Sequence, residues 1–401
     1  MKHHLLMRIL TACLCAVLTV SSVYAEEIAD IGTKDYECYE RLARWDTLPD
    51  GRLLFAGNRS AEARDDKDQP WIVCLNEDRT VSWEYLDDTV GTTGFYHAHV
   101  LQDGTIGVWF WQMFDNEDIP SIQSLRFFTQ DGKPTGKEVV LNTDEYVTIN
   151  NVTSSYLVRN HYTETERWSD MIDWDGNVIA RFGGKGAMSH PYCMIEEEDG
   201  LILFGSGWTD DTNDNITKTD LQGNVIWKKT ISSPWRDDIV PDIDSPVKTE
   251  DDGYLVVQHI YFTLPDTGGL GVQTALTKLD RDGNTIWIKP VDEEECMRYT
   301  EMKVYDGKTV LVYVLPENAG KQQSVWKFHW FDGKGNELGI TELKPEDLPV
   351  SSTDAGQEKI TIEGFQLVPM KDGLWGVASV FKGEKQAGSK GNDILVKVPE
   401  L

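Results

Sequence analysis

Six histidines lie outside the first 25 residues, and four of them occupy comparable places in the chain. His97 and His190 begin runs of strand-forming residues, whereas His161 and His259 end such runs, and Arg159 stands two residues before His161. Histidine can act as a nucleophile, acid or base, and the arginine guanidinium binds anionic oxygens. If the strands place these residues toward the same face, they could form one site. Otherwise, each histidine bonds a neighbouring strand or loop.

Tryptophans form a second candidate site. Trp111 ends a strand-like run, and we expect Trp208 and Trp235 near it on the same face of the molecule. Aromatic rings at such a surface stack on sugars or peptides, so the three residues would be ligand-binding. The alternative is that these side chains pack between structural repeats.

The spacing of potential ligands predicts no metal site. His97 and His99 share one strand face, and the segment 209–215 is rich in acids and amides. That segment lacks the spacing and the glycine of an EF-hand loop, so a solvated loop is the favoured interpretation.

Four cysteines remain outside the first 25 residues, namely Cys38, Cys74, Cys193 and Cys296. None has a neighbour at the spacing of a zinc or redox motif. They allow three disulfide pairings, of which Cys38 with Cys74 is the first to test, because both belong to one repeat. Four free thiols are the alternative.

The elements that must position these residues are repeated. The segment Leu279–Trp287 recurs as Thr219–Trp227 and, more loosely, as Ile172–Ile179. With the weaker copies there are six such turns, whose central residues are Arg79, Gly132, Gly176, Gly223, Gly283 and Gly335. Steps of about 44–60 residues are typical of propeller blades.

A second signal alternates with the first. Asp-Gly pairs that precede apolar runs have their glycines at 51, 104, 200, 253, 307 and 373, and Ser154-Ser155 provides a seventh turn. Asp-Gly between strand-forming runs predicts a hairpin. We therefore predict an all-β fold, a seven-bladed β-propeller with four antiparallel strands per blade. The last unit lacks its fourth strand, which the segment Ile31–Glu37 could supply, so that the N-terminal strand closes the ring.

Residues 1–25 have the pattern of a signal peptide. Lys2 and Arg8 precede the apolar run Ile9–Val20, and Val23–Ala25 resembles a cleavage site. We expect residues 26–401 to form a single propeller domain that is secreted or exported to the cell envelope. We expect no membrane insertion after cleavage, because no other segment could cross a bilayer.

Charge narrows the choice of partners. The chain has 38 Lys and Arg against 67 Asp and Glu, a formal charge of −29, which excludes a typical nucleic-acid binder. We expect many acids in the long loops of one face, where function on a rigid propeller is expected. These acids are Glu62, Asp65, Asp66, Asp68, Glu117, Asp118, Asp210, Asp211, Asp214, Asp237, Asp238 and Asp266.

The glycine turns and the tryptophans after them, Trp83, Trp227 and Trp287, resemble the tryptophan-docking repeat of pyrroloquinoline quinone proteins. The resemblance implies that these tryptophans dock between blades. It also implies a quinone, but the adjacent-cysteine pair of that family is missing, and we predict no cofactor.

A weaker resemblance concerns bacterial arylsulfate sulfotransferases. It rests on Trp83–Tyr85, on Phe95–His99 before an Asp-Gly turn, and on Arg159–His161. That family moves sulfuryl groups between phenols through a sulfohistidine. The resemblance implies that His97 or His190 is the nucleophile and that the sulfuryl oxygens are bound by His161, His259 and Arg159.

Two hypotheses follow. The leading one is an exported binding or scaffold protein, monomeric, that engages an unknown protein, peptide or glycan through the acidic long-loop face. The alternative is a sulfotransferase-like enzyme that uses the histidines.

Overall fold

The computed structural model describes most of the chain between residues 28 and 401. The described ranges are 28–31, 39–60, 68–114, 121–141, 146–162, 167–183, 191–205, 214–235, 240–263, 270–291, 300–315, 325–344, 347–348, 360–382 and 391–401. Within these ranges, no helix has the length and apolar character needed to span a membrane.

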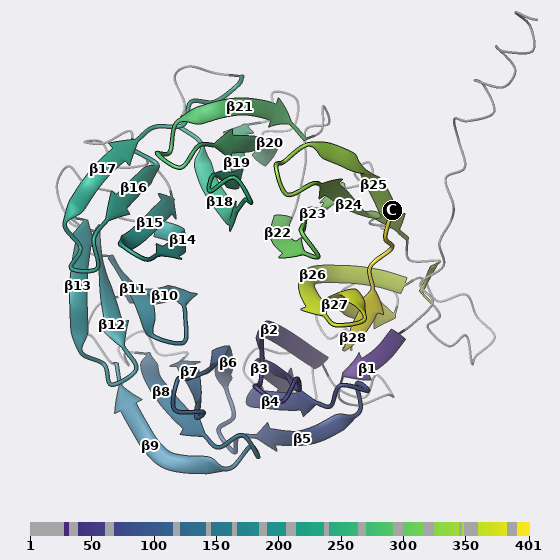
Figure 1. Ribbon diagram of the computed structural model, residues 1–401. Coiled ribbons are helices and arrows are strands. Elements are labelled where there is room, and N and C mark those ends of the chain that lie inside the picture. Colours follow the sequence, from purple (N-terminus) through teal and green to yellow (C-terminus); the bar gives the residue numbers. More distant parts are fainter. Residues whose placement is uncertain are drawn as a thin grey trace, which may run out of the picture.

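The strands form seven four-stranded antiparallel blades arranged in a ring, as predicted (Figure 1). Blades 1 to 3 are β2 (Tyr39–Thr47), β3 (Leu53–Ser60), β4 (Gln69–Leu75), β5 (Val81–Leu86); β6 (Thr92–Val100), β7 (Ile106–Met113), β8 (Ile122–Phe128), β9 (Pro134–Val140); and β10 (Tyr146–Val152), β11 (Tyr156–Tyr162), β12 (Arg167–Asp173), β13 (Val178–Gly183). Blades 4 and 5 are β14 (Pro191–Glu197), β15 (Gly200–Gly205), β16 (Ile216–Thr219), β17 (Val225–Lys229); and β18 (Asp242–Lys248), β19 (Tyr254–Thr263), β20 (Leu270–Leu279), β21 (Thr285–Pro290). Blade 6 is β22 (Thr300–Tyr305), β23 (Lys308–Leu315), β24 (Val325–Phe331), β25 (Glu337–Leu343).

Blade 7 is completed by the beginning of the chain. It contains β26 (Ile360–Met370), β27 (Gly373–Lys382) and β28 (Gly391–Lys397), and β1 (Ile28–Ile31) pairs antiparallel with β28. The predicted closure by an N-terminal strand is confirmed. The strand lies earlier than the predicted segment Ile31–Glu37, because Ile28 pairs with Val396 and Ile31 with Asp393.

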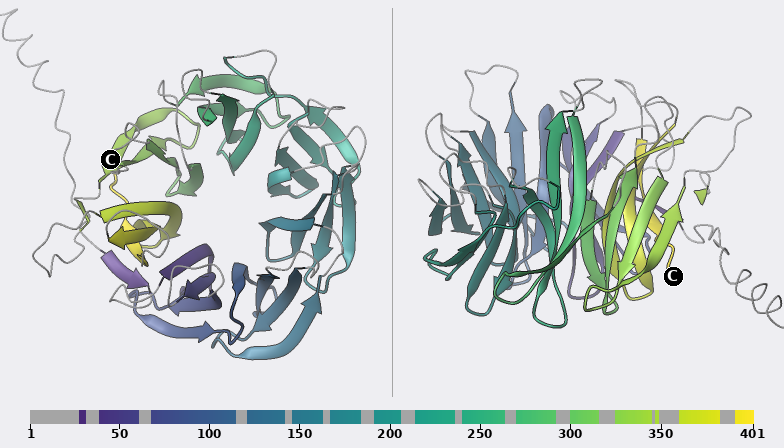
Figure 2. Two further views of the ribbon diagram at one scale, coloured as in Figure 1. Left: turned by 180° about the vertical axis from the view of Figure 1, so that it is seen from behind. Right: turned by 90° about the horizontal axis from the view of Figure 1, so that it is seen from above.

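The first strand of each blade lies innermost, around the centre of the ring (Figures 1 and 2). Six of these seven inner strands contain a register shift against the second strand, and only β22 runs without one. Such bulges bend a strand and redirect its side chains. The side chains of the inner strands therefore cannot be assigned to one face by simple alternation.

The glycine turns have the geometry that the repeat predicts. In blade 5, Oδ1 of Asp280 accepts hydrogen bonds from the backbone N–H groups of Asp282 and Asn284 at 2.9 and 2.8 Å. Gly283 has φ +75°, a left-handed conformation that favours glycine. Arg79 adopts φ +69° at the equivalent place in blade 1, so the register of the repeat is kept there without glycine.

The tryptophans dock on the turn of the next blade, as predicted. A Cβ on Gly132 would lie 2.4 Å from the ring of Trp83, and a Cβ on Gly283 would lie 2.6 Å from the ring of Trp227. Nε1 of Trp83 also donates to the carbonyl oxygen of Gln130 at 2.9 Å. Glycine is therefore required at these turns for close packing as well as for its φ.

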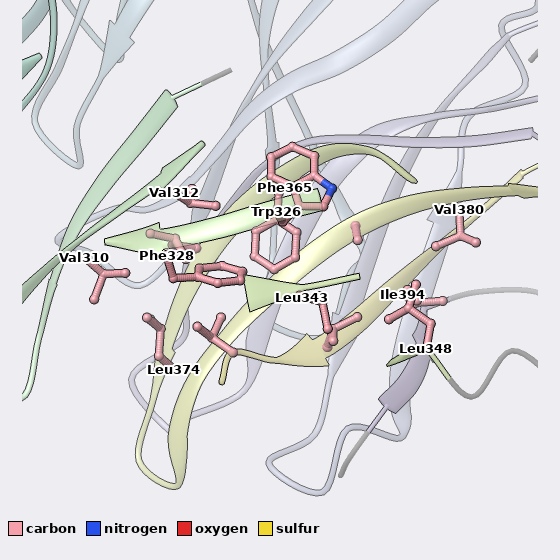
Figure 3. Packing of buried hydrophobic residues seen from close by; sticks show 14 of the residues in the cluster. Val310, Val312, Trp326, Phe328, Leu343, Leu348, Phe365, Leu374, Val380 and Ile394 are labelled. Carbon is pink, nitrogen blue, oxygen red and sulfur yellow. The ribbon is translucent and has the colours of Figure 1, made fainter. Parts of the chain in front are cut away.

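The hydrophobic core consists of seven clusters, each packed between two neighbouring blades. Figure 3 shows the cluster between blades 6 and 7, in which Trp326, Phe328 and Phe365 lie together. Cys74 belongs to the cluster between blades 1 and 2 as a free, fully buried thiol, and burial raises its pKa to about 11. Because Cys74 is a free thiol, the suggested disulfide between Cys38 and Cys74 is wrong. Cys38 and Cys296 lie outside the described residues.

Candidate functional site

The structure brings two of the predicted site residues together. In blade 3, Nε2 of His161 and Nη2 of Arg159 lie 3.0 and 3.3 Å from Oδ2 of Asp170. Nε of Arg181 approaches Oδ1 of Asp170 at 2.7 Å, and the ring of His161 stacks on Trp168 with centroids 4.7 Å apart. Three strand residues of one blade, Arg159, His161 and Arg181, thus form a polar cluster around Asp170.

Asp170 is ionised in this cluster. Its side chain is only 1% exposed, and burial alone raises its pKa. The contacts with His161 and Arg181 outweigh burial and hold the pKa well below its ordinary value. The positive charges of the cluster are consequently engaged by a carboxylate of the protein itself.

The other predicted histidines lie in different blades. His97 of β6 is buried and stacks on Trp109 of β7, with centroids 5.8 Å apart. His259 of β19 places Nδ1 3.2 Å from Oγ1 of Thr274, and burial lowers its pKa although the charge of Asp244 partly raises it. His190 lies outside the described residues. Of the predicted site residues, Arg159 and His161 thus meet at one partner, Asp170.

The predicted tryptophan site is described for two of its members. Trp111 packs against Tyr96 with centroids 5.6 Å apart and borders the cluster between blades 2 and 3. Trp235 follows blade 4 and is half-buried, while Trp208 lies outside the described residues.

Of the acids predicted for the long loops, Asp68 and Asp214 are described, and each contacts another side chain. Asp68 accepts from Asn58, and Asp214 lies 3.5 Å from Lys228.

A cavity of about 330 Å³ opens among the inner strands of blades 4 to 7. Its polar lining consists of Cys193, Asp244, Ser245, Glu301, Lys303 and Gln366. Met194, Met302, Trp326 and Phe365 supply apolar surface. This mixture of apolar walls and a few polar groups is typical of small-ligand sites. Across the described ranges, no group of three or more His, Cys, Asp and Glu residues could hold a metal ion.

Of the two acids in this lining, Asp244 leaves more of its hydrogen-bond acceptor capacity unused by the described residues. Its Oδ1 lies 2.9 Å from Sγ of Cys193 and 2.5 Å from the backbone N of Ser245. Ser245 has φ +48°, and the register of β18 shifts between Asp244 and Val247. The bulge determines how the Asp244 carboxylate lies against the cavity.

On the opposite wall, Oε2 of Glu301 accepts from the backbone N–H of Leu367 at 2.5 Å. Nζ of Lys303 lies 3.5 Å from Oε1 of Glu301. Trp326 is 1% exposed, and its Nε1 has no hydrogen-bond partner in the described part of the chain. The cavity lining therefore combines two carboxylates and one ammonium group with a tryptophan whose buried indole N–H is unpaired.

These cavity residues are not among the site residues predicted from the sequence. They come from four blades, and nothing in their spacing connects them. One local signal was present, because Pro246 lies in β18, and a proline within a strand marks a bulge or an edge.

The strand order and the pairing of β1 with β28 define the protein as a seven-bladed β-propeller closed by its N-terminal strand. The chain matches no protein-family model and no curated protein sequence. It is similar to the β-propeller domain of the Trilobed protease from Pyrococcus furiosus, with 12% identity, a TM-score of 0.50, and coverage of 90% of this chain and 94% of that one. At this identity the likeness establishes the fold alone.

Two further solved structures are similar at lower scores. Prolyl oligopeptidase B from Galerina marginata has 11% identity and a TM-score of 0.46, with coverage of 92% of this chain. A structure of two prolyl endopeptidases has 12% identity and a TM-score of 0.45, with coverage of 86%. The chain spans 53% and 47% of the lengths of these two matches.

Proposed function

We propose that this propeller is an exported binding or scaffold protein that engages a protein, peptide or glycan. The observation that carries the proposal is the cavity of about 330 Å³ among the inner strands of blades 4 to 7. Its volume falls at the lower end of the range for ligand pockets, about 300–1,000 Å³. Export is supported by the leader-like pattern of residues 1–25.

Electrostatics favour a cationic ligand. The chain carries a formal charge of −29, and an excess of one sign around a cleft concentrates ligands of the opposite sign. Asp244 and Glu301 outnumber Lys303 in the cavity lining, so the site has the same sign as the whole protein. The acid-rich loops predicted from the sequence would extend this field to a larger partner.

Calorimetric titration of the chain from residue 26 onward, with basic, neutral and acidic peptides and with glycans, tests the proposal. We expect a basic or neutral peptide to bind and the Met194→Trp variant, which fills the cavity, to weaken binding at least about tenfold. Val304→Trp is the matched control, because Val304 is 46% exposed on β22 and is not part of the lining. Absence of binding across the panel, or equal binding by Met194→Trp, would contradict the proposal.

Sulfuryl transfer is the second candidate. It is supported by the proximity of Arg159 and His161, but both face the carboxylate of Asp170, which competes with a sulfate ester for their charge. A transfer assay with a panel of aryl sulfate donors, with His97→Ala and His190→Ala as controls, tests it. Absence of turnover by the unmodified protein would end this hypothesis.

A further inference from the structure

We infer that the cavity binds the amino-terminal end of an apolar peptide, with the ammonium group at the carboxylates and the first carbonyl oxygen at the indole of Trp326. This inference rests on the proposed binding function and specifies the ligand of the same cavity. It follows from three properties of the lining, namely an acid with unused acceptor capacity, an indole N–H without an acceptor, and apolar walls.

Asp244 has acceptor capacity to spare. An ionised carboxylate offers about four lone-pair sites on two oxygens. Both donors that approach Asp244 within the described residues, Sγ of Cys193 and the backbone N of Ser245, use Oδ1. An ammonium group has three N–H donors, so it can bond Oδ2 without displacing either protein donor.

The remaining charges of the lining favour a ligand with one net positive charge. Lys303 lies 3.5 Å from Glu301 and offsets its charge, which leaves the charge of Asp244 without a basic partner in the cavity. The amino terminus of a peptide matches this excess, because its own carboxylate lies far along the chain. A free amino acid would bring a carboxylate into the same small space.

Trp326 supplies the second requirement. The residue lines the cavity with an exposure of 1%, and its buried Nε1 has no partner among the described residues. Buried donors are nearly always paired, and an unpaired one calls for an acceptor such as a ligand oxygen. A carbonyl oxygen next to the ammonium group provides that acceptor.

The apolar walls accommodate a side chain. Trp326 and Phe365 lie with ring centroids 5.2 Å apart, and Figure 3 shows Val312 beside them at the same end of the cluster. Met194 and Met302 complete this part of the lining. Methionine adapts its shape easily, so the site favours apolar side chains without selecting one.

The backbone supports a functional interpretation of Asp244. Ser245 has φ +48°, a conformation that is costly for a residue other than glycine, and it lies in the bulge of β18. Such conformations are concentrated at binding and catalytic sites. Here the bulge brings two backbone-linked features, the Asp244 carboxylate and the Ser245 N–H that bonds it, to the cavity wall.

Three probes separate the parts of the inference in calorimetric titrations. The first is leucyl-phenylalanine amide, which has the ammonium, the carbonyl and the apolar side chains. The second is its N-acetyl derivative, which lacks the cation, and the third is phenethylamine, which lacks the carbonyl. We expect the first to bind and each of the others to bind about ten- to hundredfold more weakly. Equal binding by the acetylated probe would overturn the inference.

Variants then assign the contacts. Asp244→Asn should weaken the dipeptide amide about ten- to hundredfold, because the charge-assisted hydrogen bond is lost. Trp326→Phe should weaken the dipeptide amide but not phenethylamine. Glu342→Gln, which removes an exposed carboxylate from the outer strand β25, is the matched control and should change neither. Unchanged binding by Asp244→Asn would refute the assignment.

Alkylation provides a readout of position. Cys193 lines the cavity and is half-buried, whereas Cys74 is fully buried. The dipeptide amide should slow the alkylation of Cys193 by iodoacetamide, which peptide mapping measures. Cys74 should stay unmodified throughout. If other peptides bind and Met194→Trp weakens them while the dipeptide amide does not bind, the ligand class is wrong and the binding function stands. If no probe binds at all, both proposals fail.

Discussion

Asp170 in blade 3 and Asp244 in blade 5 are both strand carboxylates near a histidine, yet their surroundings differ. Asp170 is 1% exposed and is approached by two arginines and His161. Asp244 is half-buried and is approached by a thiol and a backbone N–H. A fully buried charge must be compensated by opposite charges and hydrogen bonds, so all contacts of the Asp170 carboxylate stabilise its own blade. The Asp244 carboxylate retains acceptor capacity for a ligand.

The largest effect should come from breaking the compensated cluster. Asp170→Asn keeps the shape of the side chain but removes the negative charge that Arg159 and Arg181 face. We expect the free energy of unfolding to fall by about 3–5 kcal/mol, the usual cost of removing one partner from a buried ion pair. Urea denaturation measures this change. A loss below about 1 kcal/mol would show that the cluster does not stabilise blade 3.

Lowering the pH should reduce the difference in unfolding free energy between the unmodified protein and Asp170→Asn. The pKa of Asp170 is lower in the folded chain than the ordinary value of about 3.9, so its contribution to stability is present above pH 4 and is lost as the pH falls. We expect the stability gap between the unmodified protein and Asp170→Asn to narrow by about 1 kcal/mol between pH 7 and pH 3. Urea midpoints at several pH values test this, and a constant gap would contradict the lowered pKa.

The smallest effect on stability should come from the cavity. Asn at position 244 keeps an oxygen for the Cys193 and Ser245 donors, so Asp244→Asn should change the free energy of unfolding by no more than about 0.5 kcal/mol. The same variant should lose peptide binding. Urea denaturation and titration of one preparation give both values. A stability loss as large as that of Asp170→Asn would remove the distinction between the two carboxylates.

Much of the fold could be predicted because its information is local. Most turns carry their own Asp and Gly, and a tryptophan that docks on the next blade stands four residues after the turn glycine, as in Gly223 and Trp227. Counting these turns gave seven blades and showed that one strand was missing. The exact closing strand was misplaced by a few residues, because β1 is short and has no turn signal of its own.

The cavity could not be predicted in the same way. Asp244, Glu301 and Trp326 come from blades 5 and 6 and meet only when the ring is formed. Bulges on the inner strands also break the alternation from which facing side chains are normally inferred. A related reason applies to the predicted histidines, of which the described ones lie in different blades. Equivalent positions in successive blades are similar in the repeat but lie at different places around the ring.

The closing strand has a consequence for the kinetics of folding. Ile28 pairs with Val396, so the contacts that close the ring join residues that are far apart in the sequence. Pairings of such large sequence separation fold slowly, because loop-closure entropy is lost before the contact stabilises the chain. Until β1 docks, β28 presents an unpaired edge, which is the usual starting point for association between incompletely folded chains. The time between synthesis of β28 and docking of β1 is therefore the period in which this propeller is most prone to aggregate.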